Sequence, residues 1–223
     1  MLFITPNPLL KPPATHIAAI ENELRRLPHL AGDRRLTVRQ VRSRCRDARK
    51  TETAAEAIGE LPSQGEATLL VLSGRFALAN FIPATANLAG CAIAELHVAT
   101  MSWSRRNIEM LCDMIDSGKI GRLWLLGSHY FKGTSPELYN LAAAELGKRS
   151  DRAKFLTVRN HGKWLLMKMA DGRAFTILSS ANLRSCKSLE GAVIFADPEL
   201  HSFNCGWIEE LFAAANKGGS CGN

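Results

Sequence analysis

The strongest constraint on the fold is an alternation of short apolar runs with helix-type patterns, which begins after a turn signal at residues 62–66. The runs at 68–73 and 93–100 have the length and composition of buried strands. Between such runs, residues 104–117 carry apolar side chains at helical spacing, and Asp171-Gly172 is a hairpin signal. The sequence therefore predicts an α/β fold with a mixed central β-sheet and helices on both faces.

The same patterns locate the remaining elements of this domain. Further strands are predicted at 120–126, 155–158, 163–169, 173–178 and 191–195, and further helices at 136–146 and from Pro198 onward. A helix is also predicted at 15–27, before the domain.

Positive charge is concentrated in one N-terminal segment. The 223-residue chain has a formal net charge of +7, and residues 33–50 hold eight basic side chains against two acidic ones. The eight are Arg34, Arg35, Arg39, Arg42, Arg44, Arg46, Arg49 and Lys50. Such a cluster favours polyanions, because each phosphate contacted releases condensed counterions. We expect a basic helical extension over 1–60 that binds nucleic acid, followed by a domain over 61–223; a merely solubilising charged face is the alternative.

The cysteine positions and the distribution of apolar residues argue against a zinc-binding, disulfide-rich, secreted or membrane-spanning protein. The six cysteines are scattered and form no CxxC pair, so we expect no structural zinc, no disulfide framework and no cofactor. The N-terminus lacks the features of a secretion signal, and the least charged stretch, 76–94, is interrupted by Pro83 and Asn87. We therefore expect a cytoplasmic protein that does not span a membrane.

The chemically informative residues lie in the last third of the chain. His161 and Lys163 are two positions apart at the start of a predicted strand, where residues i and i+2 share a face. The hairpin then returns the chain to Ser180 and Asn182, and Glu190 begins the next strand. We expect these five side chains to converge, with Glu190 accepting a hydrogen bond from the imidazole.

This combination is suited to phosphoryl transfer. A neutral imidazole can attack phosphorus and form a covalent phospho-histidine. Cationic and amide donors stabilise the oxygens on which charge develops, and a carboxylate supports the imidazolium. No metal is required for these steps.

The order H-x-K, hairpin, S-S-x-N and downstream glutamate resembles the phospholipase D superfamily of HKD phosphodiesterases, and in particular its single-motif, nuclease-like members. The resemblance implies His161 as the nucleophile, Lys163 and Asn182 as phosphate-binding residues, Ser180 as the motif serine and Glu190 as the carboxylate behind the histidine. A family site uses two H-x-K motifs and this chain has one. The resemblance therefore implies a homodimer with the site across a two-fold axis.

Two positions depart from the family pattern. The family has aspartate where this chain has Lys168, and glycine where it has Ser179. Some endonuclease-like members also lack the aspartate, so the resemblance implies activity, although less strongly than a complete motif. His129, in the segment GSHYF, is a further candidate for the pocket, with a structural role as the alternative.

The function expected is that of a metal-independent phosphodiesterase, a nuclease that acts on DNA in preference to RNA. One alternative is an inactive relative that only binds DNA through its basic segment, and a less favoured one is a phospholipid phosphodiesterase. A steep loss of affinity with rising salt is typical of a nucleic-acid binder, whereas a lipase responds to a lipid interface.

Overall fold

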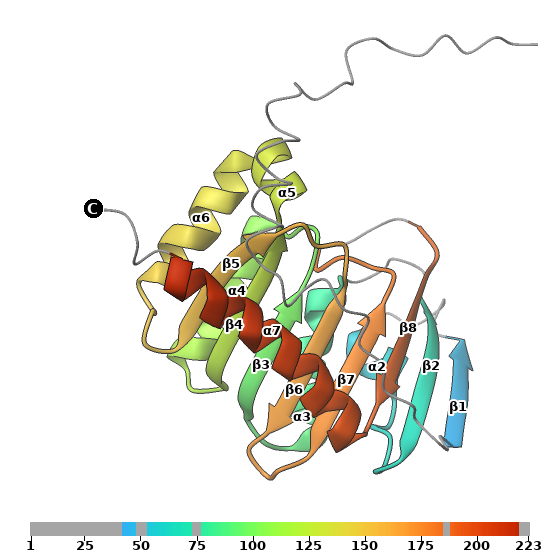
Figure 1. The fold of residues 1–223 in the computed structure, drawn as a ribbon. Helices are drawn as coiled ribbons and strands as arrows, with labels where there is room; N and C mark the ends of the chain where they lie inside the picture. Colours follow the sequence, from blue (N-terminus) through green and yellow to red (C-terminus); the bar gives the residue numbers. More distant parts are fainter. Residues whose placement is uncertain (1–41, 48–52, 73–76, 185–187, 219–223) are drawn as a thin grey trace, which may run out of the picture. The chain divides into compact units, whose positions relative to one another are not determined.

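The computed structural model describes residues 42–47, 53–72, 77–184 and 188–218 (Figure 1). Every described residue belongs to one compact unit of the chain, which spans 37–223. This unit begins earlier than residue 61, the start of the domain predicted from the sequence.

Eight strands of the described chain form one mixed sheet in the order β1-β2-β8-β7-β6-β3-β4-β5 (Figure 1). The pairs β1–β2, β3–β4 and β4–β5 are parallel, and the other neighbours are antiparallel. The predicted mixed sheet is thus confirmed. The strands are β1 (Arg42–Asp47), β2 (Glu66–Leu72), β3 (Ile93–Ala99), β4 (Ile120–Ser128), β5 (Ala153–Val158), β6 (Trp164–Met169), β7 (Ala174–Ser179) and β8 (Glu190–Phe195).

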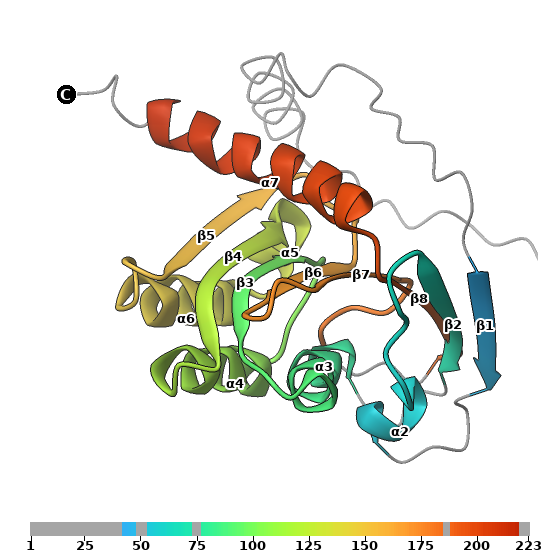
Figure 2. The ribbon, with the colours of Figure 1, turned by 90° about the horizontal axis from the view of Figure 1, so that it is seen from below.

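Helices cover both faces of this sheet, as predicted. Helices α2, α3, α4 and α6 lie on one face and α7 crosses the other (Figure 2). The helices are α2 (Ala54–Ile58), α3 (Phe81–Ala89), α4 (Arg105–Asp116), α5 (His129–Thr134), α6 (Pro136–Gly147) and α7 (Pro198–Gly218), with a 3-10 turn at Leu78–Asn80. None of the helices in the described part of the chain is long and apolar enough to span a membrane.

Helix α4 shows how the sequence pattern becomes structure. Ser104 Oγ accepts a hydrogen bond from Asn107 N at 3.3 Å, and Asn107 Oδ1 accepts one from Ser104 N at 2.9 Å. This reciprocal cap satisfies two backbone donors at the helix start. The predicted apolar positions Ile108, Leu111 and Ile115 are fully buried. Burial of each such side chain contributes about 1.5–3 kcal/mol.

The central strands are apolar on both faces because the sheet is covered on both sides. In β6, Leu165 and Met167 belong to the main core beneath α2, α3, α4 and α6. Leu166, between them, belongs to a second core with Ile208 and Leu211 of α7. The two-residue period of a strand thus divides one apolar run between two cores.

Part of the segment predicted as a helical extension, residues 42–47, forms a strand instead of a helix. Residues 42–47 form an edge strand parallel to β2, and Ala57 and Ile58 of α2 are buried in the main core. Charged residues suit an edge strand, because they discourage pairing with other chains. Of the predicted nucleic-acid-binding residues, Arg42, Arg44 and Arg46 occupy alternate positions of β1, and the other five lie outside the described residues.

A polar cluster of three buried side chains and the exposed Glu209 joins α7 to β3. His97 Nε2 lies 2.9 Å from Glu209 Oε1, and His97 Nδ1 lies 3.5 Å from Cys205 Sγ. The same Sγ lies 3.6 Å from His201 Nε2, and the His97 ring stacks on Trp124 with centroids 4.2 Å apart. Burial lowers the pKa of His97, lowers that of His201 to about 4, and raises that of the Cys205 thiol to about 12. Both histidines are therefore neutral in the fold at pH 7.5.

This cluster predicts a loss of stability in mild acid. The folded pKa of His201 lies below the unfolded value near 6.5, so the unfolded chain binds more protons as the pH falls from about 6.5 towards 4. His201 alone should lower the free energy of unfolding by about 2 kcal/mol between pH 7.5 and pH 5. Urea denaturation at the two pH values measures this loss. His201→Gln should reduce it, the exposed control His161→Gln should leave it intact, and equal stability at both pH values in the wild type would contradict it.

Candidate active site

The five predicted site residues gather at one edge of the sheet. His161 and Lys163 directly precede β6, Ser180 and Asn182 follow β7, and Glu190 begins β8. These strand ends are neighbours, since β6 pairs with β7 and β7 with β8. The carboxyl ends of β3 and β4 lie at the same edge (Figure 1).

Lys163 is the buried member of the motif pair. Its Nζ donates to the carbonyl oxygen of His161 at 2.7 Å and lies 3.3 Å from the imidazole Nδ1. Lys163 is 9% exposed, whereas His161 is exposed. Burial lowers the pKa of Lys163, and the negative charge of Glu190 acts in the opposite direction. An ammonium can only donate, so its hydrogen bond to Nδ1 leaves the proton of the neutral ring on Nε2.

Ser180 and Glu190 are joined directly across the ends of β7 and β8. Ser180 Oγ donates to the Glu190 carboxylate and accepts from Gly191 N at 3.0 Å. Ser179, which stands where the family has glycine, donates from Oγ to Gly191 O at 2.9 Å and accepts from Ala181 N at 3.0 Å. The serine at this position therefore closes the turn with its side chain.

The hydrogen bond expected between Glu190 and the imidazole of His161 is replaced by bonds from each residue to another partner. The carboxylate of Glu190 is bonded to Ser180, and the imidazole of His161 contacts Lys163. Glu190 still acts electrostatically on Lys163. The hairpin places the carboxylate at the predicted edge, but its hydrogen bond goes to the motif serine.

Sequence analysis did not identify the segment Thr100–Met101 as part of the site. This segment contacts both the segment that carries Lys163 and the segment that carries Asn182. Met101 N donates to Asn182 Oδ1 at 3.2 Å, and Lys163 Nζ lies 3.5 Å from Met101 Sδ. Leu183 N donates to Thr100 Oγ1 at 3.2 Å. The only signal in the sequence was a polar residue directly after the buried strand that becomes β3.

Asn160 is a second positioning residue that the sequence did not reveal. Its Nδ2 lies 3.2 Å from Thr100 O and 3.3 Å from Leu126 O, and its Oδ1 accepts from Gly162 N at 2.8 Å. The side chain of Asn160 thus attaches the segment that carries His161 to the carboxyl ends of β3 and β4. A Cβ at position 162 would lie 3.1 Å from Asn160 Oδ1, a tight contact that favours the glycine found there.

Lys168, the main departure from the family pattern, lies away from these residues. It is exposed and stands opposite Glu95 in the β3–β6 register. It lies five residues further along the strand than Lys163, which corresponds to roughly 16 Å. His129, the other candidate, is half-buried at the start of α5, on the edge that holds the site.

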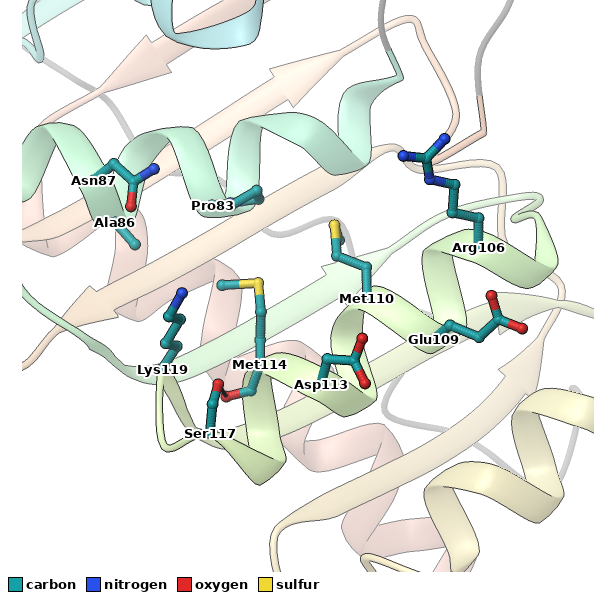
Figure 3. Close-up of a pocket in the computed structure, with 10 residues that line it drawn as sticks. All are labelled: Pro83, Ala86, Asn87, Arg106, Glu109, Met110, Asp113, Met114, Ser117 and Lys119. Atoms are coloured by element: carbon teal, nitrogen blue, oxygen red, sulfur yellow. Dashed lines mark hydrogen bonds between the residues drawn. The ribbon is translucent and has the colours of Figure 1, made fainter.

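A hollow of about 480 Å³ lies elsewhere, between α3 and α4. Figure 3 shows Met110 and Met114 of α4 facing Pro83 of α3, with Arg106 and Lys119 at opposite ends. It contains none of the predicted site residues. Among the residues that the structure describes, no group of three or more His, Cys, Asp or Glu side chains could hold a metal ion.

No protein-family model matches the chain, and no curated protein matches it. Solved structures similar to it include the phospholipase D family member Nuc from Salmonella typhimurium, with 13% identity, a TM-score of 0.47, and coverage of 67% of this chain and 96% of that one. Polyphosphate kinase from Porphyromonas gingivalis has 11% identity, a TM-score of 0.46, and coverage of 66% and 27%. TrmBL2, an archaeal chromatin protein, has 11% identity, a TM-score of 0.43, and coverage of 89% and 61%.

The chain thus spans about a quarter of that kinase and about three fifths of TrmBL2.

The contacts of Asn160 predict a specific loss of stability. Asn160→Ala removes one acceptor and the donor to two carbonyl oxygens, so the free energy of unfolding should fall by about 1–3 kcal/mol. The free energy of unfolding of Asn160→Asp should fall by a similar amount, because a carboxylate cannot donate to those carbonyl oxygens. Urea denaturation measures both, with the exposed Asn140→Ala as a control that should change little. Wild-type stability in Asn160→Asp would show that the two carbonyl contacts contribute nothing.

Proposed function

We propose that this chain is a metal-independent phosphodiesterase of the phospholipase D type that cleaves DNA through a phospho-histidine formed at His161. The observation that carries the proposal is the contact of Met101 with both Lys163 and Asn182, beside the exposed imidazole of His161. This contact supports the proposal because phosphoryl transfer requires a cation, an amide and a nucleophile near one another.

Lys163 and Asn182 are the groups that bind the phosphate in this proposal. The Oδ1 of Asn182 accepts from Met101 N, which leaves the amide nitrogen to donate to a phosphate oxygen. Among the residues that the structure describes, the buried ammonium of Lys163 forms no ion pair, and a phosphodiester anion would supply a counter-charge. Both donors are held in place before the substrate arrives, so their stabilisation of developing charge costs little reorganisation.

Substrate binding also prepares the nucleophile. In the free site Lys163 donates to Nδ1 of His161, which places the ring proton on Nε2. When Lys163 turns this hydrogen bond to a phosphate oxygen, Nδ1 can take the ring proton and Nε2 gains a lone pair. Nε2 then attacks phosphorus: the N–P bond forms and the bond from phosphorus to the leaving oxygen breaks. Water later attacks phosphorus and breaks the N–P bond, which regenerates the imidazole.

The leaving oxygen needs a proton, and a homodimer provides its source. The chain has one H-x-K motif, so a symmetric partner contributes the second. His161 of the partner subunit acts as the general acid for the leaving oxygen and as the general base for the incoming water.

One observation favours the second candidate, a catalytically inactive DNA-binding protein. The carboxylate of Glu190 is bonded to Ser180, so the imidazole lacks that support in the free chain. The two candidates share DNA binding and differ only in cleavage.

Cleavage of single-stranded and plasmid DNA in excess EDTA separates them. The wild type should cut, and His161→Ala should bind DNA normally but lose cleavage by roughly a thousandfold or more, since it lacks the nucleophile. The control Lys168→Asp lies on the exposed far end of β6 and should cut like the wild type. Cutting by His161→Ala would place the chemistry elsewhere. Abolition of wild-type cutting by EDTA would contradict the metal-independent mechanism.

The basic segment should make DNA binding steeply dependent on salt. The double substitution Arg34→Gln/Arg35→Gln should flatten the slope of log affinity against log salt by about 0.7–0.9 for each phosphate that the variant no longer neutralises. The matched control Lys119→Gln/Lys148→Gln removes two exposed positive charges away from the candidate site and should leave the slope unchanged. Fluorescence anisotropy at several salt concentrations measures both. Equal slopes in all three proteins would mean that the segment is only a solubilising face.

A further inference from the structure

An exposed aromatic ring stands at the edge of the sheet that carries the candidate site. Tyr130 is 67% exposed and is the second residue of α5. Its backbone is fixed, because Tyr130 N donates to Ser128 Oγ at 3.3 Å and Thr134 Oγ1 donates to Tyr130 O at 3.0 Å. Among the described residues its ring stacks on no other ring and lies under no cation. Tyr139, in contrast, packs its ring against Phe155.

The strand register places the start of α5, which carries Tyr130, near the segment that carries His161. Ser128 at the end of β4 stands opposite Val158 at the end of β5, and α5 begins one residue later. The chain leaves β5 through Asn160, which reaches back to Leu126 O of β4. Leu126 and Tyr130 are separated by two strand residues and a turn, a distance on the order of 10 Å. The backbone of Tyr130 therefore lies just beyond the end of β4, near the point where Asn160 contacts this strand.

Exposed arginines border the same edge. Arg159 follows β5 directly, and Arg184 follows Leu183, whose backbone N is bonded to Thr100 Oγ1. Within the described ranges neither arginine forms an ion pair. Positive charge for a phosphate backbone and an exposed aromatic ring for a base are thus both present at the edge of the sheet that carries His161 and Lys163. This is the combination found where proteins hold single strands.

We propose that Tyr130 is a stacking platform for a base of single-stranded DNA bound at the candidate site, and that it gives the protein a preference for single strands over duplexes. The proposal deepens the proposed function and rests on it for the position of the scissile phosphate. Every base has a π-face, so stacking tolerates any sequence. In a duplex the faces are covered by neighbouring base pairs, so only an unpaired base can lie on the ring.

Binding is measured in EDTA and in the His161→Ala background, so that the DNA stays intact. Four probes are compared: a short oligo(dT), an abasic strand of the same length, a blunt duplex, and oligo(rU). Tyr130→Ala should weaken oligo(dT) binding by roughly tenfold, in line with the effect of removing one stacked base. Binding of the abasic strand and the duplex should not change. Tyr130→Phe should keep the wild-type affinity, because it keeps the ring.

The control is Leu88→Ala, which removes another exposed apolar side chain, on α3, and should alter none of the affinities. Equal binding of oligo(dT) with tyrosine or alanine at position 130 would overturn the proposal. An equal loss on the abasic strand would also overturn it, because the ring would then not act by stacking. A tenfold loss on oligo(rU) with none on oligo(dT) would contradict the assignment of DNA as the partner.

A separate readout keeps this proposal distinct from the proposed function. Hydrolysis of bis(p-nitrophenyl) phosphate needs the phosphoryl-transfer residues but offers no nucleobase. If the wild type fails to hydrolyse this diester and DNA alike, the nuclease proposal fails. The loss of oligo(dT) binding in Tyr130→Ala would then still support a stacking platform.

Discussion

The buried residue Thr100 connects the two segments that carry the candidate site residues. It follows β3 directly, its Oγ1 accepts from Leu183 N at 3.2 Å, and its backbone oxygen accepts from Asn160 Nδ2 at 3.2 Å. One residue thereby fixes the segment that carries the histidine and the segment that carries the asparagine. Its neighbour Met101 contacts Lys163 and Asn182 in turn. The relative position of the two halves therefore depends on the end of a third strand, which carries neither half.

The electrostatic state of Lys163 connects this framework to chemistry. Its ammonium is buried against His161 O and Met101 Sδ, two neutral acceptors, and burial lowers its pKa. A buried cation that is bonded mainly to neutral groups interacts strongly with an incoming anion. Glu190 limits this effect by adding negative charge nearby, while its own hydrogen bond goes to Ser180. Within the described residues Lys163 forms no ion pair, which is the feature on which the proposed binding of a phosphate rests.

Local patterns predicted much of the fold and the position of the candidate site residues at neighbouring strand ends, whereas contacts distant in sequence could not be predicted. The spacing of His161 and Lys163 and the β6–β7 hairpin depend on neighbouring residues, so the sequence located them correctly. Asn160 is linked to a strand end 60 residues away, which no periodicity reveals. The partner of Glu190 depends on side-chain rotamers at two strand ends. Strand β1 was expected as a helix because its charged sequence lacks the apolar alternation of a buried strand.

Trapping the covalent intermediate would decide whether His161 is the nucleophile. Wild-type protein is mixed with single-stranded DNA in EDTA, quenched in alkaline denaturant during turnover, and examined by intact and peptide mass spectrometry. We expect a nucleotide fragment joined through phosphorus to the peptide that contains His161, and no such adduct in His161→Ala. Continued DNA cleavage without an adduct on His161 would contradict the phospho-histidine mechanism.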